Sequence, residues 1–416
     1  MSVSRLMLAA SLLALSLPAA AQTPEETAMA ALEEAPVWDG HNDVPGQLRG
    51  RFGNVIGDFD FTHTLEGERW TPGEMHTDIA RLREGKVGVQ WWSVYVSASL
   101  EEPVAVQTTL EQIDVLKRLI AENPDDMTLA LTSGDVEKAL AEGKIAGMIG
   151  MEGGHSIGTS LAVLRQMYDL GARYMTLTHS SNTSWADSAT DDPEHDGLTD
   201  WGVQLVQEMA RLGMMIDLSH VSEATMMDAL DATDAPVMFS HSSARAVTGH
   251  ARNVPDTVLR RLPENDGIVM VVALPGYISE GQRQRNANRA AEKARLESLN
   301  LGNPAAVEAG LVAWDDANPV PDATIADMAD HIDHIRDLIG VDYIGIGGDY
   351  DGMFSGPVGM EDVTGYPALF TELARRGYSQ EDLEKISSGN MMRVLKKAEA
   401  YAASMADVPP IETATN

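Results

Sequence analysis

The feature that most restricts the fold is a pattern that repeats along the chain after Gln22. A short apolar run rich in β-branched residues ends in a polar residue or a glycine, and a helical stretch follows. Several runs are apolar on both faces, as expected of strands buried in a parallel sheet. Eight such runs predict an α/β fold with eight βα units, and therefore a (β/α)8 barrel. The predicted strands are Val37–His41, Val87–Tyr95, Ile145–Glu152, Arg173–His179, Met214–His220, Pro236–His241, Ile268–Leu274 and Tyr343–Asp349.

The segments between these strands fit the same interpretation. No linker rich in Pro, Gly or Ser divides the chain, so residues 22–416 are predicted to form one domain. A doubly wound open sheet remains the alternative arrangement. The predicted helical stretches include Glu101–Asn123, Leu161–Leu170, Thr199–Leu212 and Ser222–Leu230. Two connections exceed the usual loop length and are expected at the mouth or on the outside of the barrel, namely Val44–Gly73 and Ser279–Asp322.

Composition excludes several classes of function. Hydrophobic residues make up 44% and charged residues 22% of the 416 positions, which is typical of a globular protein. The formal net charge of −33 would repel nucleic-acid phosphates and anionic lipid, so neither is an expected partner. The chain contains no cysteine, which excludes disulfides, thiolate metal ligands and cysteine nucleophiles.

The first 21 residues have the pattern of a secretory signal peptide. Arg5 is followed by an apolar run from Leu6 to Leu17, then by Pro18 and small residues before Gln22. The run is shorter than the ~20 apolar residues that a membrane-spanning helix needs. We therefore expect cleavage near residue 21 and export to a periplasm or the medium.

Polar residues recur at the carboxyl ends of the predicted strands. In a barrel these ends meet at one mouth, where catalytic residues collect. Any one of them could merely hydrogen-bond a loop, but seven at one level favour a functional site. Imidazole and carboxylate together suit Zn²⁺, Mn²⁺ or Fe²⁺. The seven residues are His41, Asp43, Glu152, His179, His220, His241 and Asp349.

Other chemistry-bearing residues have plainer interpretations. His331 and His334 lie one turn apart in a predicted amphipathic helix and are expected on its solvated face. The 22 methionines, several of them in adjacent pairs, are expected to fill the core rather than to bind copper. No phosphate-binding P-loop motif occurs in the sequence.

Nine phrases in order along the chain give a resemblance to a known family. The set resembles the renal or membrane dipeptidase family, the zinc peptidases of family M19, and it runs from the first predicted strand to the last helix. The phrases are DGHNDVP (39–45), HTDIARLREGKVGVQWWSVYV (76–96), GMEGGHSI (150–157), YMTLTHSSNTSWADS (174–188), IDLSHVS (216–222), FSHSSARAV (239–247), RNVPD (252–256), GIGGDYDG (345–352) and SGNMMRVLKKAE (388–399).

The resemblance implies a metal-dependent amidohydrolase-like barrel with two zinc ions. His41 and Asp43 would hold one ion, His220 and His241 would hold the other, and Glu152 would bridge both. His179 would contact the substrate above the metals. Asp349 would handle protons, with Asp351 as the rival candidate. Arg252, expected in a loop over the mouth, would bind the terminal carboxylate of the substrate.

The activity that this resemblance implies is hydrolysis of dipeptides with a free C-terminal carboxylate, by attack of a hydroxide that bridges the two zinc ions. A related binuclear hydrolase acting on N-acyl amino acids or β-lactams is the alternative enzyme. The alternative that is not an enzyme is a barrel that binds peptides or metal without turnover. The resemblance also implies a homodimer. The absence of a hydrophobic C-terminal tail predicts that no lipid anchor is attached.

Overall fold

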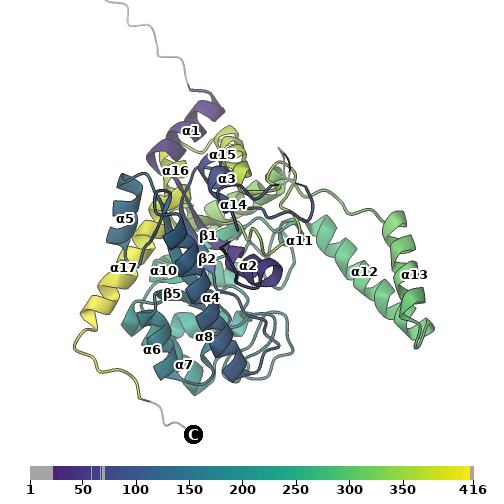
Figure 1. Cartoon of the computed structure of the whole chain (residues 1–416), viewed down its shortest axis with the longest axis horizontal. Coiled ribbons are helices and arrows are strands. Elements are labelled where there is room, and N and C mark those ends of the chain that lie inside the picture. The colour runs from purple at the N-terminus through teal and green to yellow at the C-terminus, as the bar shows by residue number, and fades with distance from the viewer. Residues whose placement is uncertain (1–21, 58, 66, 68–70, 413–416) are drawn as a thin grey trace, which may run out of the picture.

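The computed structural model describes residues 22–57, 59–65, 67 and 71–412. Eight parallel strands close into a barrel, and helices surround it (Figure 1). The predicted signal peptide, residues 1–21, lies outside the described residues. In the described part of the chain, no helix has both the length and the apolar character needed to cross a bilayer.

Closure of the barrel follows from the strand pairings. The order around the sheet is β1-β2-β4-β5-β6-β7-β8-β9, and β9 pairs back to β1 through Asp39 and Ile346. All eight predicted strands are therefore confirmed, and the open sheet is wrong. The strands are β1 (Val37–Asn42), β2 (Val87–Ser93), β3 (Met127–Leu129), β4 (Ile145–Glu152), β5 (Ala172–Thr176), β6 (Met215–Asp217), β7 (Val237–Phe239), β8 (Ile268–Val272) and β9 (Ile344–Gly347).

One strand, β3, is additional to the prediction. It pairs with the first half of β4, from Met127 opposite Ile145, whereas β5 pairs with the second half, from Ile149 opposite Ala172. It therefore extends the sheet beside the N-terminal half of β4 and is not one of the eight strands that close the barrel. Three residues are too few to show a periodicity that distinguishes a strand from a loop.

Methionines fill much of the barrel interior, as predicted. Met148, Met215, Met238 and Met270 come from four strands and form one buried cluster with Trp38 of β1 and Trp91 of β2. The unbranched methionine side chain adapts to irregular gaps between converging strands. The cluster continues into α17, so that the core below the mouth is packed with apolar side chains.

The helices begin where the sequence provides capping residues. Thr199 and Ser222 each accept a hydrogen bond from a backbone amide in the first turn of the following helix. All four predicted helical stretches are confirmed. The helices are α1 (Pro24–Glu34), α2 (Val44–Phe52), α3 (Ile79–Glu84), α4 (Glu102–Glu122), α5 (Ser133–Ala141), α6 (Leu161–Asp169), α7 (Asp200–Leu212), α8 (Glu223–Ala232), α9 (Asp256–Leu259), α10 (Leu262–Asn265), α11 (Pro275–Ile278), α12 (Glu280–Leu299), α13 (Pro304–Ala317), α14 (Ile325–Ile339), α15 (Tyr366–Arg375), α16 (Gln380–Glu384) and α17 (Asn390–Ser404), with single turns at Gly154–Ile157, Val341–Tyr343, Val363–Gly365 and Lys385–Gly389.

The two long connections contain helices of their own. Helix α2 begins at Val44, directly after the strand-end segment of β1. Helices α12 and α13 form a hairpin that stands away from the barrel, at the right of Figure 1. The long second connection is therefore outside the barrel, as expected, but it is an ordered arm rather than a loop.

Candidate active site

All seven predicted strand-end residues lie at one end of the barrel. His41 and Glu152 belong to β1 and β4, and Asp43 directly follows β1. His179, His220, His241 and Asp349 stand two or three residues beyond the ends of their strands. Six of the seven, together with Arg252, line one cavity of about 360 Å³, and His41 is fully buried beneath it. This volume lies in the range of small-molecule sites.

A larger hollow, of about 640 Å³, lies between α2 and α4. It is lined by Arg49 and Arg118, and each of these already pairs with a carboxylate, Glu111 and Asp114 respectively. It contains no histidine. The smaller cavity at the barrel mouth therefore has the chemistry of an active site, and the larger hollow does not.

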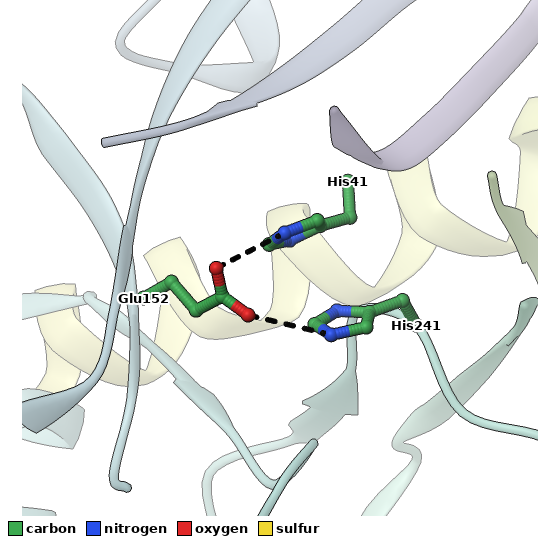
Figure 2. Close-up of side chains that lie close together, drawn as sticks. All are labelled: His41, Glu152 and His241. Carbon is green, nitrogen blue, oxygen red and sulfur yellow. Dashed lines mark ion pairs between the residues drawn. The ribbon is translucent and has the colours of Figure 1, made fainter. Parts of the chain in front are cut away.

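Glu152 is at the centre of the candidate site. Its Oε2 lies 3.4 Å from Nε2 of His41, whereas its Oε1 lies 3.0 Å from Nε2 of His220 and 3.5 Å from Nε2 of His241. Figure 2 shows the carboxylate between His41 and His241, with one oxygen directed to each. Asp43 lies on the His41 side, with Oδ2 3.3 Å from Nε2 of His41. One carboxylate thus faces two separate sets of side chains.

Neighbouring hydroxyl groups fix the outer ring nitrogens of two histidines. Nδ1 of His41 is 2.8 Å from the hydroxyl of Tyr174, and Nδ1 of His241 is 2.8 Å from Oγ of Ser240. The Ser240 hydroxyl in turn donates to Oδ2 of Asp217 at 2.7 Å. Such partners orient imidazoles so that Nε2 points to a metal. Both Nε2 atoms accordingly face Glu152.

The protonation states of His220, His241 and Glu152 suit metal ligation. Burial lowers the pKa of His220 and of His241 well below the usual value, so these imidazoles are neutral and can offer a lone pair. Burial opposes ionisation of Glu152, but the surrounding histidines outweigh it and hold the pKa of this carboxyl low. Burial also raises the pKa of Asp349 to about 8, with the nearby carboxylates of Asp43 and Glu152 acting in the same direction.

The donor set fits a pair of divalent cations. Nε2 of His41 is buried without a hydrogen-bond partner among the described residues, although two carboxylates lie within 3.4 Å of it. Nε2 of His41 is thus close to both carboxylates without forming a hydrogen bond to either, as expected of a ligand directed at an ion. Three groups have ligand atoms within 4.8 Å of one another, namely His41, Glu152 and His241; Glu152, His179 and His220; and His41, Asp43 and Asp349.

These groups divide the histidines differently from the prediction, which assigns His220 and His241 to the same ion. Their two Nε2 atoms nevertheless lie 3.0 Å apart, and both face Oε1 of Glu152. His41 faces the other oxygen. The predicted division therefore remains the one that matches the two oxygens of the carboxylate.

Arg252 is a buried cation without a carboxylate partner. It follows β7 in a loop, as predicted, but its side chain is only 1% exposed and not solvated. Its guanidinium donates to Oγ of Ser242 at 3.2 Å and to the His241 carbonyl at 3.3 Å, and it lies over the ring of Tyr277. Among the described residues no acidic group is within ion-pair distance of it, which is costly for a buried charge unless an anion binds there.

Several residues that line or support the cavity were not predicted from the sequence. Tyr95 packs its ring 4.8 Å from that of His179, and Tyr277, Gln47 and Leu274 also line the cavity. Tyr174 and Asp217 are polar groups inside buried strands, which is a signal that could have identified them as supports of the site. His331 was wrongly expected on a solvated face, because it is fully buried in α14.

A family model described as membrane dipeptidase, peptidase family M19, matches residues 25–408. The chain belongs to this family. As a member of the M19 family it is a metal-dependent dipeptidase, as the sequence resemblance implied. Dipeptidase 3 of Rattus norvegicus is 39% identical over 93% of this chain and 70% of its own length. Dipeptidase aclJ of Aspergillus oryzae is 40% identical over 92% of this chain and 82% of its own length.

Solved structures give the same fold for this M19 member. The probable dipeptidase PvdM from Pseudomonas aeruginosa superposes with a TM-score of 0.78 at 22% identity, covering 91% of this chain and 99% of that one. A metallopeptidase from Rhodobacter sphaeroides superposes with a TM-score of 0.71 at 25% identity, covering 88% and 99%. That crystal structure holds a phosphinate mimic of the dipeptide L-Ala-D-Ala.

Proposed function

We propose that this chain is a binuclear zinc dipeptidase that hydrolyses dipeptides with a free C-terminal carboxylate. The observation that carries the proposal is the position of Glu152, whose two oxygens face different groups of side chains. His41 and Asp43 would hold one ion, His220 and His241 the other, and Glu152 both. Two zinc ions held in this way would supply an activated water at neutral pH and would polarise the peptide carbonyl.

Asp349 is the proposed proton carrier of the reaction. It is buried, and its carboxylate lies within 4.8 Å of the ligand atoms of His41 and Asp43, where it could reach a water held by the predicted metals. It would take a proton from the attacking water and deliver it to the leaving amine. His179, half-buried above Glu152, would donate its N–H to the oxyanion that develops on the carbonyl.

Arg252 is the proposed binding group for the terminal carboxylate. A guanidinium can form a bidentate, charge-assisted pair with a carboxylate. The cavity is small, and Arg252 lies within it together with the predicted metal ligands. A substrate held at its terminal carboxylate would therefore present its only peptide bond to the metals, which favours dipeptides over longer chains.

A two-by-two kinetic comparison tests this assignment. Arg252→Ala should reduce kcat/KM for a dipeptide by roughly 10–150-fold, because a contact of ~1.5–3 kcal/mol is lost. The C-terminal amide of the same dipeptide should lose far less. Arg252→Lys should recover part of the activity, since a point charge cannot form the bidentate pair. Equal losses on the acid and the amide would show that Arg252 supports the structure instead.

The substrate panel should also contain N-acyl amino acids and a β-lactam. Both present a carboxylate and a scissile carbonyl, and the same site could accept them. If these compounds are hydrolysed and dipeptides are not, the dipeptidase assignment is wrong and the alternative hydrolase is correct.

We further propose that residues 1–21 direct export of the chain.

We also propose that two copies form a homodimer through the arm made by α12 and α13. The arm buries only Leu296, Val307 and Leu311 in a cluster of its own. Its tip exposes Leu299 and Leu301, which are 68% and 86% accessible. We infer that a second copy would cover these two side chains.

A further inference from the structure

The turn that carries Asp349 has an unfavourable backbone. Asp349 and Asp351 have φ angles of 61° and 65°, in the left-handed region that non-glycine residues avoid. Such a conformation is less favourable than a right-handed one even for aspartate, and contacts with the surroundings stabilise it. The turn follows β9 directly and leads back to the mouth of the barrel. The contacts of this turn therefore bear on where the Asp349 carboxylate lies.

His76 makes a reciprocal pair of hydrogen bonds with this turn. Its backbone N–H donates to Oδ1 of Asp351 at 2.9 Å, and the backbone N–H of Asp351 donates to Nδ1 of His76 at 2.9 Å. The two residues are 275 positions apart in the sequence and are each 3% exposed. The ring of His76 also lies 5.8 Å from that of Tyr350. Burial lowers the pKa of His76 to about 4, so Nδ1 keeps its lone pair at neutral pH.

The segment that carries His76 is itself anchored. The next residue, Thr77, accepts a hydrogen bond at 2.8 Å from the side-chain amide of Asn42, which lies at the end of β1. Asp78 caps α3 and pairs with Arg81, and Arg81 reaches Asp362 at 3.0 Å. His76 is thus a fixed point on a buried segment, and it can restrain what it contacts.

The restrained turn is joined to the predicted metal ligands. The N–H of Asp349 donates to the carbonyl of His41 at 3.0 Å, and the N–H of Asp43 donates to the carbonyl of Tyr350 at 2.9 Å. Asp351, which lines the cavity beside Asp349, is turned toward His76 through its Oδ1. A change in the turn would therefore move Asp349 relative to His41 and Asp43.

We propose that His76 is a positioning residue that holds the Asp349–Gly352 turn, and through it the Asp349 carboxylate, in the geometry for proton transfer. The kinetic consequence rests on the proposed function, whereas the restraint on the turn does not. The same contacts assign Asp351 to support of the turn and leave Asp349 as the group that faces the metals.

Two substitutions separate the hydrogen bond from the bulk of the ring. His76→Leu removes the acceptor for the Asp351 N–H, whereas His76→Asn places an amide oxygen near the position of Nδ1 and can keep it. Leu205→Ala is a control for lost stability, because Leu205 is buried in α7 outside the site. All variants are assayed well below their melting temperatures, with zinc content measured on each.

Kinetics give the first readout. We expect His76→Leu to lower kcat by roughly 10–100-fold with KM changed little and full metal content, because small displacements of a catalytic group cost factors of this size. His76→Asn should recover most of kcat, and Leu205→Ala should keep it. Equal losses in the Leu and Asn variants, or a loss of metal in His76→Leu, would overturn the positioning role.

Hydrogen exchange gives a readout that does not depend on turnover. Amides of the peptide spanning 346–353 should exchange at least tenfold faster in His76→Leu than in the wild type, and at nearly the wild-type rate in His76→Asn. Unchanged exchange in His76→Leu would overturn the proposal. If the wild type hydrolyses no dipeptide, the proposed function fails, and the exchange measurement still decides whether His76 holds the turn.

Discussion

Two buried aspartates support the histidines at the mouth of the barrel. Asp39 accepts hydrogen bonds from the Gly348 amide and the Tyr366 hydroxyl, both at 2.7 Å. Asp217 accepts from the amide and hydroxyl of Ser240, at 2.8 and 2.7 Å. Each carboxylate precedes a predicted ligand by two or three residues in its own strand segment, and each ties that segment to a neighbouring strand. Buried polar groups with all these partners give the site its rigidity.

At the residue scale, Asp349 and Asp351 should respond very differently to replacement by asparagine. Asp349→Asn should retain bound metal but lose ~10²–10⁴-fold in kcat, because an amide cannot carry the proton. Asp351→Asn should be affected much less, since an amide oxygen can still accept the hydrogen bond from His76. Kinetics and metal analysis of both variants check this. A nearly normal Asp349→Asn with a severely impaired Asp351→Asn would reverse the two roles.

At the scale of the elements, α14 is joined to the site by a buried histidine. Nδ1 of His331 accepts from the amide of Ala244 at 3.0 Å, and its Nε2 lies 3.2 Å from the carbonyl of Ile278. This arrangement needs the neutral ring, because a proton on Nδ1 would face the Ala244 N–H. Burial lowers the pKa of His331 to about 4. The helix, α11 and the segment after His241 are thereby linked by one side chain.

This histidine should make stability depend on pH. The pKa of His331 in the folded protein is below the ~6.5 of an unfolded histidine. The contribution of His331 to the free energy of unfolding is therefore complete above about pH 6.5, and it is lost as the pH falls toward the folded pKa. Between about pH 7.5 and about pH 5 the loss should be about 2 kcal/mol in the free energy of unfolding. Urea unfolding of metal-free wild type and His331→Gln measures it. An equal pH dependence in both proteins would contradict the prediction.

The elements also show what the sequence could and could not predict. The eight barrel strands were predictable because both faces are buried, which makes each strand an apolar run such as that of β4. The ligand-type residues at their ends were predictable because the barrel brings all carboxyl ends to one mouth. His76 was not, since its partner Asp351 is 275 residues away and no local pattern records the contact. The burial of Arg252 and His331 depends on tertiary packing in the same way.

At the scale of the whole molecule, two surface features affect how copies of the chain meet, namely the net charge and the α12–α13 arm. A net charge of −33 keeps copies apart at long range, yet the arm presents apolar side chains at its tip. Because this charge repels, two copies would associate only where apolar side chains come into close contact. The arm buries Leu296, Val307 and Leu311 between its own helices, and the proposed contact with a second copy would cover further apolar surface.

The homodimer proposal is tested by changing the tip of the arm. The double variant Leu299→Glu with Leu301→Glu should be monomeric by light scattering at concentrations where the wild type is dimeric, because two charges would be buried in the interface. Val104→Glu is the matched control, since Val104 is 50% exposed on α4. A monomeric wild type, or a double variant that remains dimeric, would show that the arm does not mediate dimerisation.

In the proposed function, one carboxylate, that of Glu152, organises two metal ions for dipeptide hydrolysis. Titration of metal-free protein with zinc, with turnover of a dipeptide followed at each addition, tests it most directly. We predict that activity reaches its maximum at two zinc ions per chain, and that Glu152→Gln binds less zinc and recovers no activity, because both ions lose a shared ligand. Maximal activity at one zinc per chain, or full zinc content with activity in Glu152→Gln, would contradict the claim.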